Sequence, residues 1–240
     1  MTARPVKLHL VPSAPVPEPS SDRAPDSEVT EVRGDQPVRS SETSALDALG
    51  DESLVPLVAQ GHMGATELLY RRHAAFAFNL GVRIAGSATD VEDVVHDAFL
   101  RAFESIGSLR NPKAFRSWLG SIVVHATRSR LRRGKLLRLF GLGRGGDVVD
   151  IDCIASDQAS PRARAELAQV YALLQTLPAD DRIAWTLRFV EGHDLKAAAE
   201  LAGCSLATIK RRIRRAQRYL KNHFVAAHDG ADGADKELEP

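Results

Sequence analysis

Apolar residues recur every three to four positions through two long stretches of this 240-residue chain, residues 51–133 and 161–225. That spacing gathers them on one side of an α-helix, and neither stretch alternates strictly between apolar and polar positions as a β-strand does. The first stretch predicts four helices, with a break near Gly61–Gly64 and a fourth helix that starts near Pro112. The second stretch predicts four more. The sequence therefore predicts an all-α fold.

Composition shifts separate these stretches from the rest of the chain. Residues 1–48 hold seven of the twelve prolines, lack apolar periodicity and predict a disordered N-terminal extension. Residues 134–164 contain five glycines and predict a flexible linker. Residues 226–240 predict an acidic disordered tail. Between them, we expect two small helical domains, residues 49–133 and 165–225.

The formal net charge of +1 conceals large local differences. The two expected domains carry net charges of +3 and +4 and the expected linker +1, whereas the N-terminal extension carries −3 and the C-terminal tail −4. Basic bodies between acidic tails are typical of proteins that bind a polyanion.

The most basic segment is CSLATIKRRIRRAQRYLK, residues 204–221, in which seven of eighteen residues are Lys or Arg and none is acidic. On a helix, Ile209, Ile213, Ala216 and Leu220 form one narrow apolar stripe, and the basic residues cover nearly all of the remaining surface. A solvated charged face ordinarily mixes signs, whereas like charges alone repel one another unless a partner neutralises them. We therefore expect this helix to bind DNA.

The residues before this helix predict a helix-turn-helix. AAAELAG precedes it, with Gly203 suited to a tight turn and Ser205 suited to cap the next helix. In such modules the N-terminal half of the second helix enters the major groove. The sequence leaves open whether its arginines contact guanine edges or phosphates. The DNA-contacting residues expected here are Ser205, Thr208, Lys210, Arg211, Arg212, Arg214 and Arg215.

The helix expected over residues 91–106 has two different faces. Its core stripe consists of valines, alanines and phenylalanines, and Thr89 or Asp90 is the expected N-cap. On the other side, Asp93, Asp97, Leu100 and Glu104 lie within about 60° of one another. An acidic stripe around an exposed leucine suits a protein partner with a basic, partly apolar face, although a merely solvated face stays open as an alternative.

The following helix is basic and contains aromatic residues, a combination suited to single-stranded DNA, on which bases stack. Trp118 has a second interpretation, as an ordinary core residue. The DNA-contacting residues expected in this region are Lys113, Phe115, Arg116, Trp118, His125, Arg128, Arg130, Arg132 and Arg133.

The sequence lacks the patterns typical of membrane spans, signal peptides, metal sites and enzyme active sites. It has no run of 18 apolar residues, prolines interrupt its N-terminus where a signal peptide is apolar, and its two cysteines and eight histidines are scattered. The carboxylates near residues 90–97 lie on different helix sides, and no glycine-rich phosphate loop is present. We expect a cytoplasmic, non-enzymatic protein with no metal, no cofactor and no membrane insertion.

The order of these motifs resembles the extracytoplasmic-function (ECF) group of bacterial RNA polymerase sigma factors. The resemblance rests on DVEDVVHDAFLRAFESI, then FRSWLGSIVVHATRSRLRR, then LPADDRIAWTLRFVEGHDLKAAAELAGCSLATIKRRIRRAQRYL. It implies that the first domain binds the clamp helices of the polymerase β′ subunit and opens the −10 promoter element. It also implies that the second domain reads the −35 element and contacts the β flap. An anti-sigma factor is a further partner that the resemblance implies.

The resemblance also implies roles for individual positions. It places Asp93, Asp97, Leu100, Arg101 and Glu104 in a helix that would contact polymerase. It implies that the basic helix would separate the −10 strands and that residues 205–215 would read the −35 element. The protein would be nucleoid-associated when in holoenzyme. One departure is that the family commonly has Ala-Arg-Asn where this chain has Val123, Val124 and His125.

The alternative from the residues alone is a stand-alone helix-turn-helix regulator. Such a protein needs a sensor or dimerisation module, and residues 49–133 show neither a parallel-sheet pattern nor a ligand-pocket pattern. A nucleic-acid enzyme fits less well, since it needs clustered carboxylates or a nucleophile beside a base.

Overall fold

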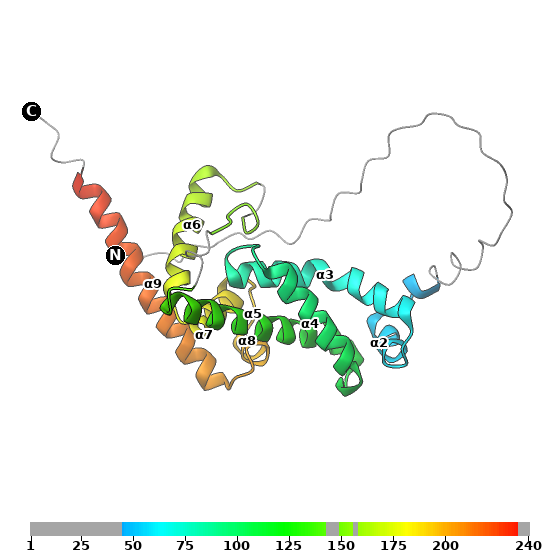
Figure 1. The fold of residues 1–240 in the computed structure, drawn as a ribbon. Coiled ribbons are helices and arrows are strands. Elements are labelled where there is room, and N and C mark those ends of the chain that lie inside the picture. The colour runs from blue at the N-terminus through cyan, green and yellow to red at the C-terminus, as the bar shows by residue number, and fades with distance from the viewer. Residues whose placement is uncertain (1–44, 143–148, 156–157, 235–240) are drawn as a thin grey trace, which may run out of the picture.

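A computed structural model describes residues 45–142, 149–155 and 158–234 of the chain, and its side chains as far as residue 223. Within these ranges every regular element is helical, which confirms the all-α prediction (Figure 1). The elements are α2 (Asp51–Ala59), α3 (Met63–Ala85), α4 (Val91–Ser105), the 3₁₀ turns η1 (Ile106–Ser108) and η2 (Pro112–Ala114), α5 (Phe115–Leu139), α6 (Pro161–Thr176), α7 (Ala179–Phe189), α8 (Leu195–Leu201) and α9 (Leu206–Ala234).

The N-terminal half is built on α3, α4 and α5, each of which contacts the other two. The core stripe expected on α4 is buried at Val91, Val94, Val95, Ala98, Phe99 and Ala102, and Phe103 packs against it. Helix α3 ends at Ala85 and is capped by Gly86, whose φ of 72° is the left-handed conformation that glycine adopts without steric cost.

The start of α4 differs in detail from the expectation. Asp90 occupies the N-cap position, but it has a φ of 62° and its side chain caps no amide of the helix. Aspartate tolerates this left-handed region better than most residues. Its carboxylate instead forms an ion pair with Arg130 of α5.

Helix α5 is longer than the sequence suggested. The expected linker began at residue 134, whereas the helix continues through Gly134 to Leu139. One interior glycine costs a helix only about 1 kcal/mol, and good helix formers such as Lys135, Leu136 and Leu137 follow it. The described part of the expected linker also packs on the protein, because Ile154 is buried and the Asp150 amide donates to the Gly86 carbonyl at 3.1 Å.

The C-terminal half contains the predicted helix-turn-helix, formed by α8 and α9. Asp194 caps α8 by accepting from the Ala197 amide at 2.7 Å, and Ser205 caps α9 by accepting from the Thr208 amide at 3.2 Å. Gly203, in the turn between them, has a φ of 59°. The predicted stripe of Ile209, Ile213, Ala216 and Leu220 on α9 is buried. These side chains belong to a core that α6, α7 and α8 complete, and α7 makes the most extensive contact with α9.

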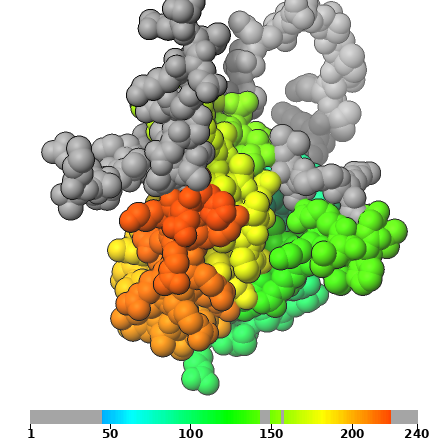
Figure 2. Space-filling view, turned by 90° about the vertical axis from the view of Figure 1, so that its left-hand side faces the viewer, coloured from blue at the N-terminus to red at the C-terminus, as the bar shows by residue number. Residues whose placement is uncertain are grey.

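The two halves pack against each other. Helix α5 contacts α7 and α8, α3 contacts α7, and the buried residues of both halves form one hydrophobic cluster. Figure 2 shows yellow residues of the C-terminal half directly against green residues that include α5. The buried Tyr171 of α6 also donates its hydroxyl hydrogen to the Arg83 carbonyl of α3 at 3.1 Å. The helices that carry the predicted DNA contacts therefore lie on bodies that touch.

The α9 stripe generates a stability prediction. Ile209 is fully buried, whereas Leu206 on the same helix is 45% exposed. We expect Ile209→Ala to lower the free energy of unfolding by about 2–5 kcal/mol, since it removes buried methyl groups and leaves a cavity. Leu206→Ala is the matched control, with an expected change within about 0.5 kcal/mol. Urea unfolding followed by circular dichroism measures both, and equal losses would contradict the assigned stripe.

Candidate nucleic-acid interface

The predicted DNA-reading residues of α9 divide into two groups. Ser205, Lys210, Arg211 and Arg214 are exposed, and Thr208 is half-buried beside the Ser205 hydroxyl at 2.9 Å. On the helical wheel, Arg211 and Arg214 lie on the side away from the buried stripe. These side chains are available to a groove of DNA.

The other two arginines of the predicted set face α7. Arg215 forms a bidentate ion pair with Asp181, whose side chain is 0% exposed. Arg212 lies 3.2 Å from the Asp180 carboxylate. Hydrogen bonding to Asp181 raises the pKa of Arg215 above its ordinary value.

The basic residues of α5 also fall into two groups, those that pair with the C-terminal half and those that do not. Arg128 and Arg132 point towards the C-terminal half, where Arg128 Nε lies 2.9 Å and Arg132 Nη2 lies 2.7 Å from oxygens of Asp180. Arg128 also donates to the Ala202 carbonyl at 2.6 Å. Burial is the main cause that lowers the pKa of Arg128, with Arg212 and Arg132 adding to the effect and Asp180 opposing it.

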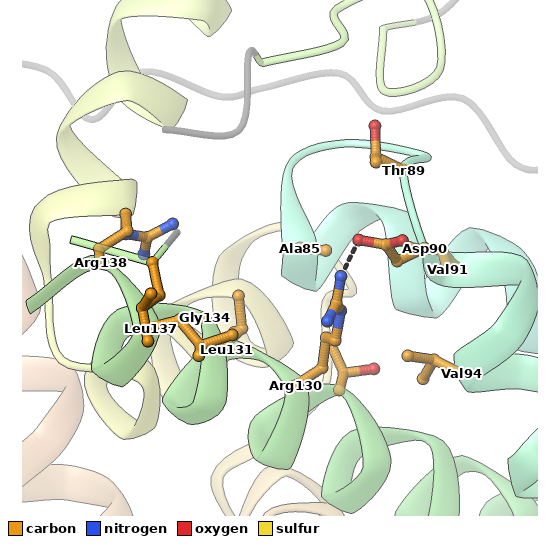
Figure 3. A pocket seen from close by; sticks show the side chains of 12 residues that line it. Ala85, Thr89, Asp90, Val91, Val94, Arg130, Leu131, Gly134, Leu137 and Arg138 are labelled. Carbon is orange, nitrogen blue, oxygen red and sulfur yellow. Dashed lines mark hydrogen bonds and ion pairs between the residues drawn. The ribbon is translucent and has the colours of Figure 1, made fainter. Parts of the chain in front are cut away.

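Arg130 points in a different direction from Arg128 and Arg132. Its guanidinium pairs with Asp90, and both residues line a pocket of about 300 Å³ between the start of α4 and the end of α5 (Figure 3). Val94, Leu131 and Leu137 give the pocket apolar walls. Arg133 is exposed on the same helix. The three arginines from residue 128 to 132 therefore do not form one continuous surface.

The aromatic members of the predicted set lie differently from the expectation. Phe115 is fully buried and packs edge-on against the ring of His73, with centroids 5.1 Å apart. A side chain closed off from solvent cannot stack on a base, so the prediction of Phe115 as a DNA contact is wrong for this structure. Trp118 is half-buried and packs on Phe115 with centroids 6.1 Å apart, which leaves part of its ring accessible.

The remaining members of this set are accessible at the surface. Lys113 and Arg116 are exposed, and the Arg116 guanidinium lies 3.8 Å above the ring of Phe76. His125 is exposed, and its Nδ1 lies 2.9 Å from the Ser121 carbonyl. His125 also approaches the helix-turn-helix closely, because a Cβ placed on Gly203 would lie 2.7 Å from its ring.

The predicted acidic stripe of α4 is exposed throughout. Asp93, Asp97, Arg101 and Glu104 are exposed, and Leu100 is 50% exposed among them. An exposed leucine at the centre of charged residues is the arrangement expected of a protein-binding face.

Sequence reasoning missed Asp180 and Asp181. Their one sequence signal is their position in the first turn of α7, where acidic residues commonly stabilise a helix dipole. Nothing in the spacing shows that the ion pairs of Asp180 reach α5, about fifty residues earlier in the chain.

In the described parts of the chain, no group of three or more His, Cys, Asp or Glu side chains is placed to hold a metal ion. No helix in the same ranges has both the length and the apolar character required to cross a membrane.

The fold and these faces define the class of the molecule: a two-part helical DNA-binding protein with a helix-turn-helix at its C-terminal end. Two family profiles match it, Sigma-70 region 2 over residues 69–136 and Sigma-70, region 4 over residues 167–220. The chain is 32% identical over 184 residues to the ECF RNA polymerase sigma-E factor of Haemophilus influenzae, covering 73% of this chain and 96% of that protein. It is 30% identical over 190 residues to the sigma-E factor of Escherichia coli K12, covering 73% and 95%.

Solved structures agree with this assignment. CnrH in complex with the cytosolic domain of CnrY is 28% identical, with a TM-score of 0.50 over 73% of this chain and 97% of that one. RpoE of Bartonella quintana, in complex with the anti-sigma factor NepR, shares the fold at 22% identity with a TM-score of 0.52, over 65% and 94% of the two chains. The chain belongs to the ECF group of RNA polymerase sigma factors, which direct promoter-specific initiation of transcription.

The cap of α8 generates a pH prediction. The hydrogen bond from the Ala197 amide lowers the pKa of Asp194 below its ordinary value of 3.8. The stabilisation it provides is present above that value and is lost as pH falls through the lower folded-state pKa. We expect Asp194→Ala to lower the melting temperature near neutral pH and to differ less from wild type below about pH 4.

Thermal unfolding followed by circular dichroism at several pH values measures this effect. Glu200→Ala, an exposed acid on the same helix, is the matched control. A difference between Asp194→Ala and wild type that stays constant from pH 7 to the acid limit would contradict the cap assignment.

Proposed function

We propose that residues 49–133 bind core RNA polymerase and open the −10 promoter element, and that residues 165–225 read the −35 element. Residues 134–164 connect the two. This division follows the placement of the two family matches along the chain. The observation that carries it is the separation of an acidic, leucine-centred face on α4 from basic faces on α5 and α9.

The α4 face is the proposed contact with polymerase. A basic, partly apolar surface such as the β′ clamp helices complements carboxylates around a leucine. We assign the β flap to the C-terminal domain. The α4 residues proposed for the contact are Asp93, Asp97, Leu100, Arg101 and Glu104.

The DNA contacts are proposed in two groups. For the −35 element, the exposed residues Lys210, Arg211 and Arg214 contact DNA with Ser205 and Thr208, and Arg212 and Arg215 join them when released from α7. For the −10 element, the proposed residues are Lys113, Arg116, Trp118, His125, Arg128, Arg130, Arg132 and Arg133.

The remaining features of the proposal follow from the family. The chain acts as a non-enzymatic subunit without cofactor, in the cytoplasm, and associates with the nucleoid as part of holoenzyme. We also propose an anti-sigma factor as a partner. Two solved relatives support it, since one is in complex with the cytosolic domain of CnrY and the other with the anti-sigma factor NepR.

The proposed contact between α9 and the −35 element predicts a selective loss of transcription. In the double variant Arg211→Ala, Arg214→Ala, each lost contact to DNA costs about 1–3 kcal/mol. We therefore expect at least about a tenfold fall in run-off transcription from a promoter selected with wild-type holoenzyme. Arg162→Ala, at an exposed site on α6, is the control. If the double variant instead lost polymerase binding and still recognised DNA, the assignment of these residues to DNA would be wrong.

The polymerase assignment predicts the converse. Asp93→Lys with Asp97→Lys reverses the charge of the α4 face, and we expect the affinity for core polymerase to fall at least about tenfold. Glu92→Lys, a single charge reversal on another side of the same helix, should leave the affinity within about twofold of wild type. Fluorescence anisotropy with labelled protein and purified core measures both. Unchanged affinity in the double variant would refute the acidic-face assignment.

A further inference from the structure

The end of α5 exposes a cluster of large apolar side chains. Leu139, Phe140 and Leu142 are between 71% and 76% exposed, and Leu136 and Leu137 just before them are also exposed. In the described part of the chain, five of the ten exposed large apolar side chains therefore lie within residues 136–142, which we call the apolar tip. Single apolar residues are normal on a protein surface, whereas a cluster indicates contact with an apolar partner.

The backbone holds the apolar tip in a defined shape. Gly141 has a φ of 70°, the Leu142 amide donates to the Leu137 carbonyl at 2.9 Å, and the Gly141 amide donates to the Arg138 carbonyl at 3.1 Å. This pair of hydrogen bonds is a Schellman motif, which commonly ends a helix at a glycine. Figure 2 shows green residues that include the end of α5 projecting from one side of the molecule.

The charged residues around the apolar tip are all cations. Arg133, Lys135 and Arg138 are exposed, and no acidic residue occurs from residue 128 to residue 142. Within the described ranges these three side chains take part in no ion pair, unlike the arginines at positions 128, 130 and 132. The end of α5 therefore complements a surface that is both anionic and apolar.

The pocket between α4 and α5 lies beside the apolar tip. Leu137, Arg138 and Leu142 of this segment line it, and Leu131 adds a further apolar wall (Figure 3). Arg138 is the cation of the pocket that is not paired with Asp90, because Arg130 occupies that carboxylate. A free cation beside apolar walls suits an amphipathic anion.

We propose that the apolar tip binds the surface of a membrane rich in anionic lipid, with its leucines and phenylalanine in the boundary between headgroups and acyl chains. Lys135 and Arg138 contact lipid phosphates, and the pocket receives one anionic headgroup. Apolar residues beside Lys and Arg at a helix surface are the pattern of segments that lie on a bilayer without crossing it. This binding goes beyond the proposed function and does not depend on it.

Other partners fit the apolar tip less well. DNA would neutralise the cations but would leave Leu139 and Phe140 in water. A second copy of the chain would bring two positively charged tips together, which is unfavourable. A protein partner would have to present acidic and apolar groups together, and core polymerase enters the test as that alternative.

The test measures binding of the full chain to extruded vesicles by flotation. Vesicles of phosphatidylglycerol with phosphatidylethanolamine present an anionic surface, and vesicles of phosphatidylcholine are the neutral comparison. We expect wild type to bind the anionic vesicles at least about tenfold more tightly than the neutral ones. Each cation near an anionic surface contributes about fivefold in affinity, so Lys135→Gln with Arg138→Gln should weaken this binding at least about tenfold.

A second variant measures the apolar contribution. Leu139→Ser with Phe140→Ser keeps every charge, and we expect it to bind anionic vesicles at least about tenfold more weakly, because apolar burial in the bilayer is lost. Met63→Ser is the matched control, since Met63 is 80% exposed at the start of α3, and it should bind within about twofold of wild type. Circular dichroism checks that both variants are folded.

A fluorophore reports whether the apolar tip enters the bilayer. An environment-sensitive dye on Phe140→Cys, in a chain with Cys153 and Cys204 changed to Ser, should shift its emission to the blue on anionic vesicles. The same dye on Met63→Cys should not shift.

Three results would overturn the proposal. The first is equal binding of wild type to both kinds of vesicle, or binding to neither. The second is unchanged binding of the folded Leu139→Ser, Phe140→Ser variant to anionic vesicles. The third is a loss of affinity for core polymerase in that variant while wild type binds no vesicles, which would make the apolar tip a protein contact.

Discussion

Repulsion between like charges is the constraint on which this structure depends. Helices α5 and α9 carry many arginines, and such helices are stable in contact only if anions lie between them. The first turn of α7 supplies two. Asp180 and Asp181 neutralise arginines from both helices, and this neutralisation lets the aliphatic surfaces of the two halves form one hydrophobic cluster.

Much of the fold follows from local patterns in the sequence. The stripes on α4 and α9 and the caps at Asp194 and Ser205 depend on residues within one or two helical turns, so periodicity and capping rules are sufficient to place them. The exposed face of α4 was predictable for the same reason. The length of α5 was not, because Gly134 favours a break only weakly and the residues around it favour helix.

The candidate site was predicted less completely, because its geometry depends on contacts between distant segments. A run of arginines has the same sequence pattern whether its side chains face DNA, Asp90 or Asp180. Only tertiary packing distinguishes Arg130 from Arg128 and Arg132. Phe115 illustrates the same limit. An aromatic residue among basic ones suits base stacking in sequence, but the packing of α5 on α3 places this ring beside His73 in the core.

Gly120 of α5 and Leu201 of α8, which pack closely, give the interface between the two halves a property that its arginines alone do not provide. Added salt weakens an ionic contact, whereas an apolar contact is kept, and salting-out anions strengthen it. An interface that combines the two changes less with ionic strength than either part alone.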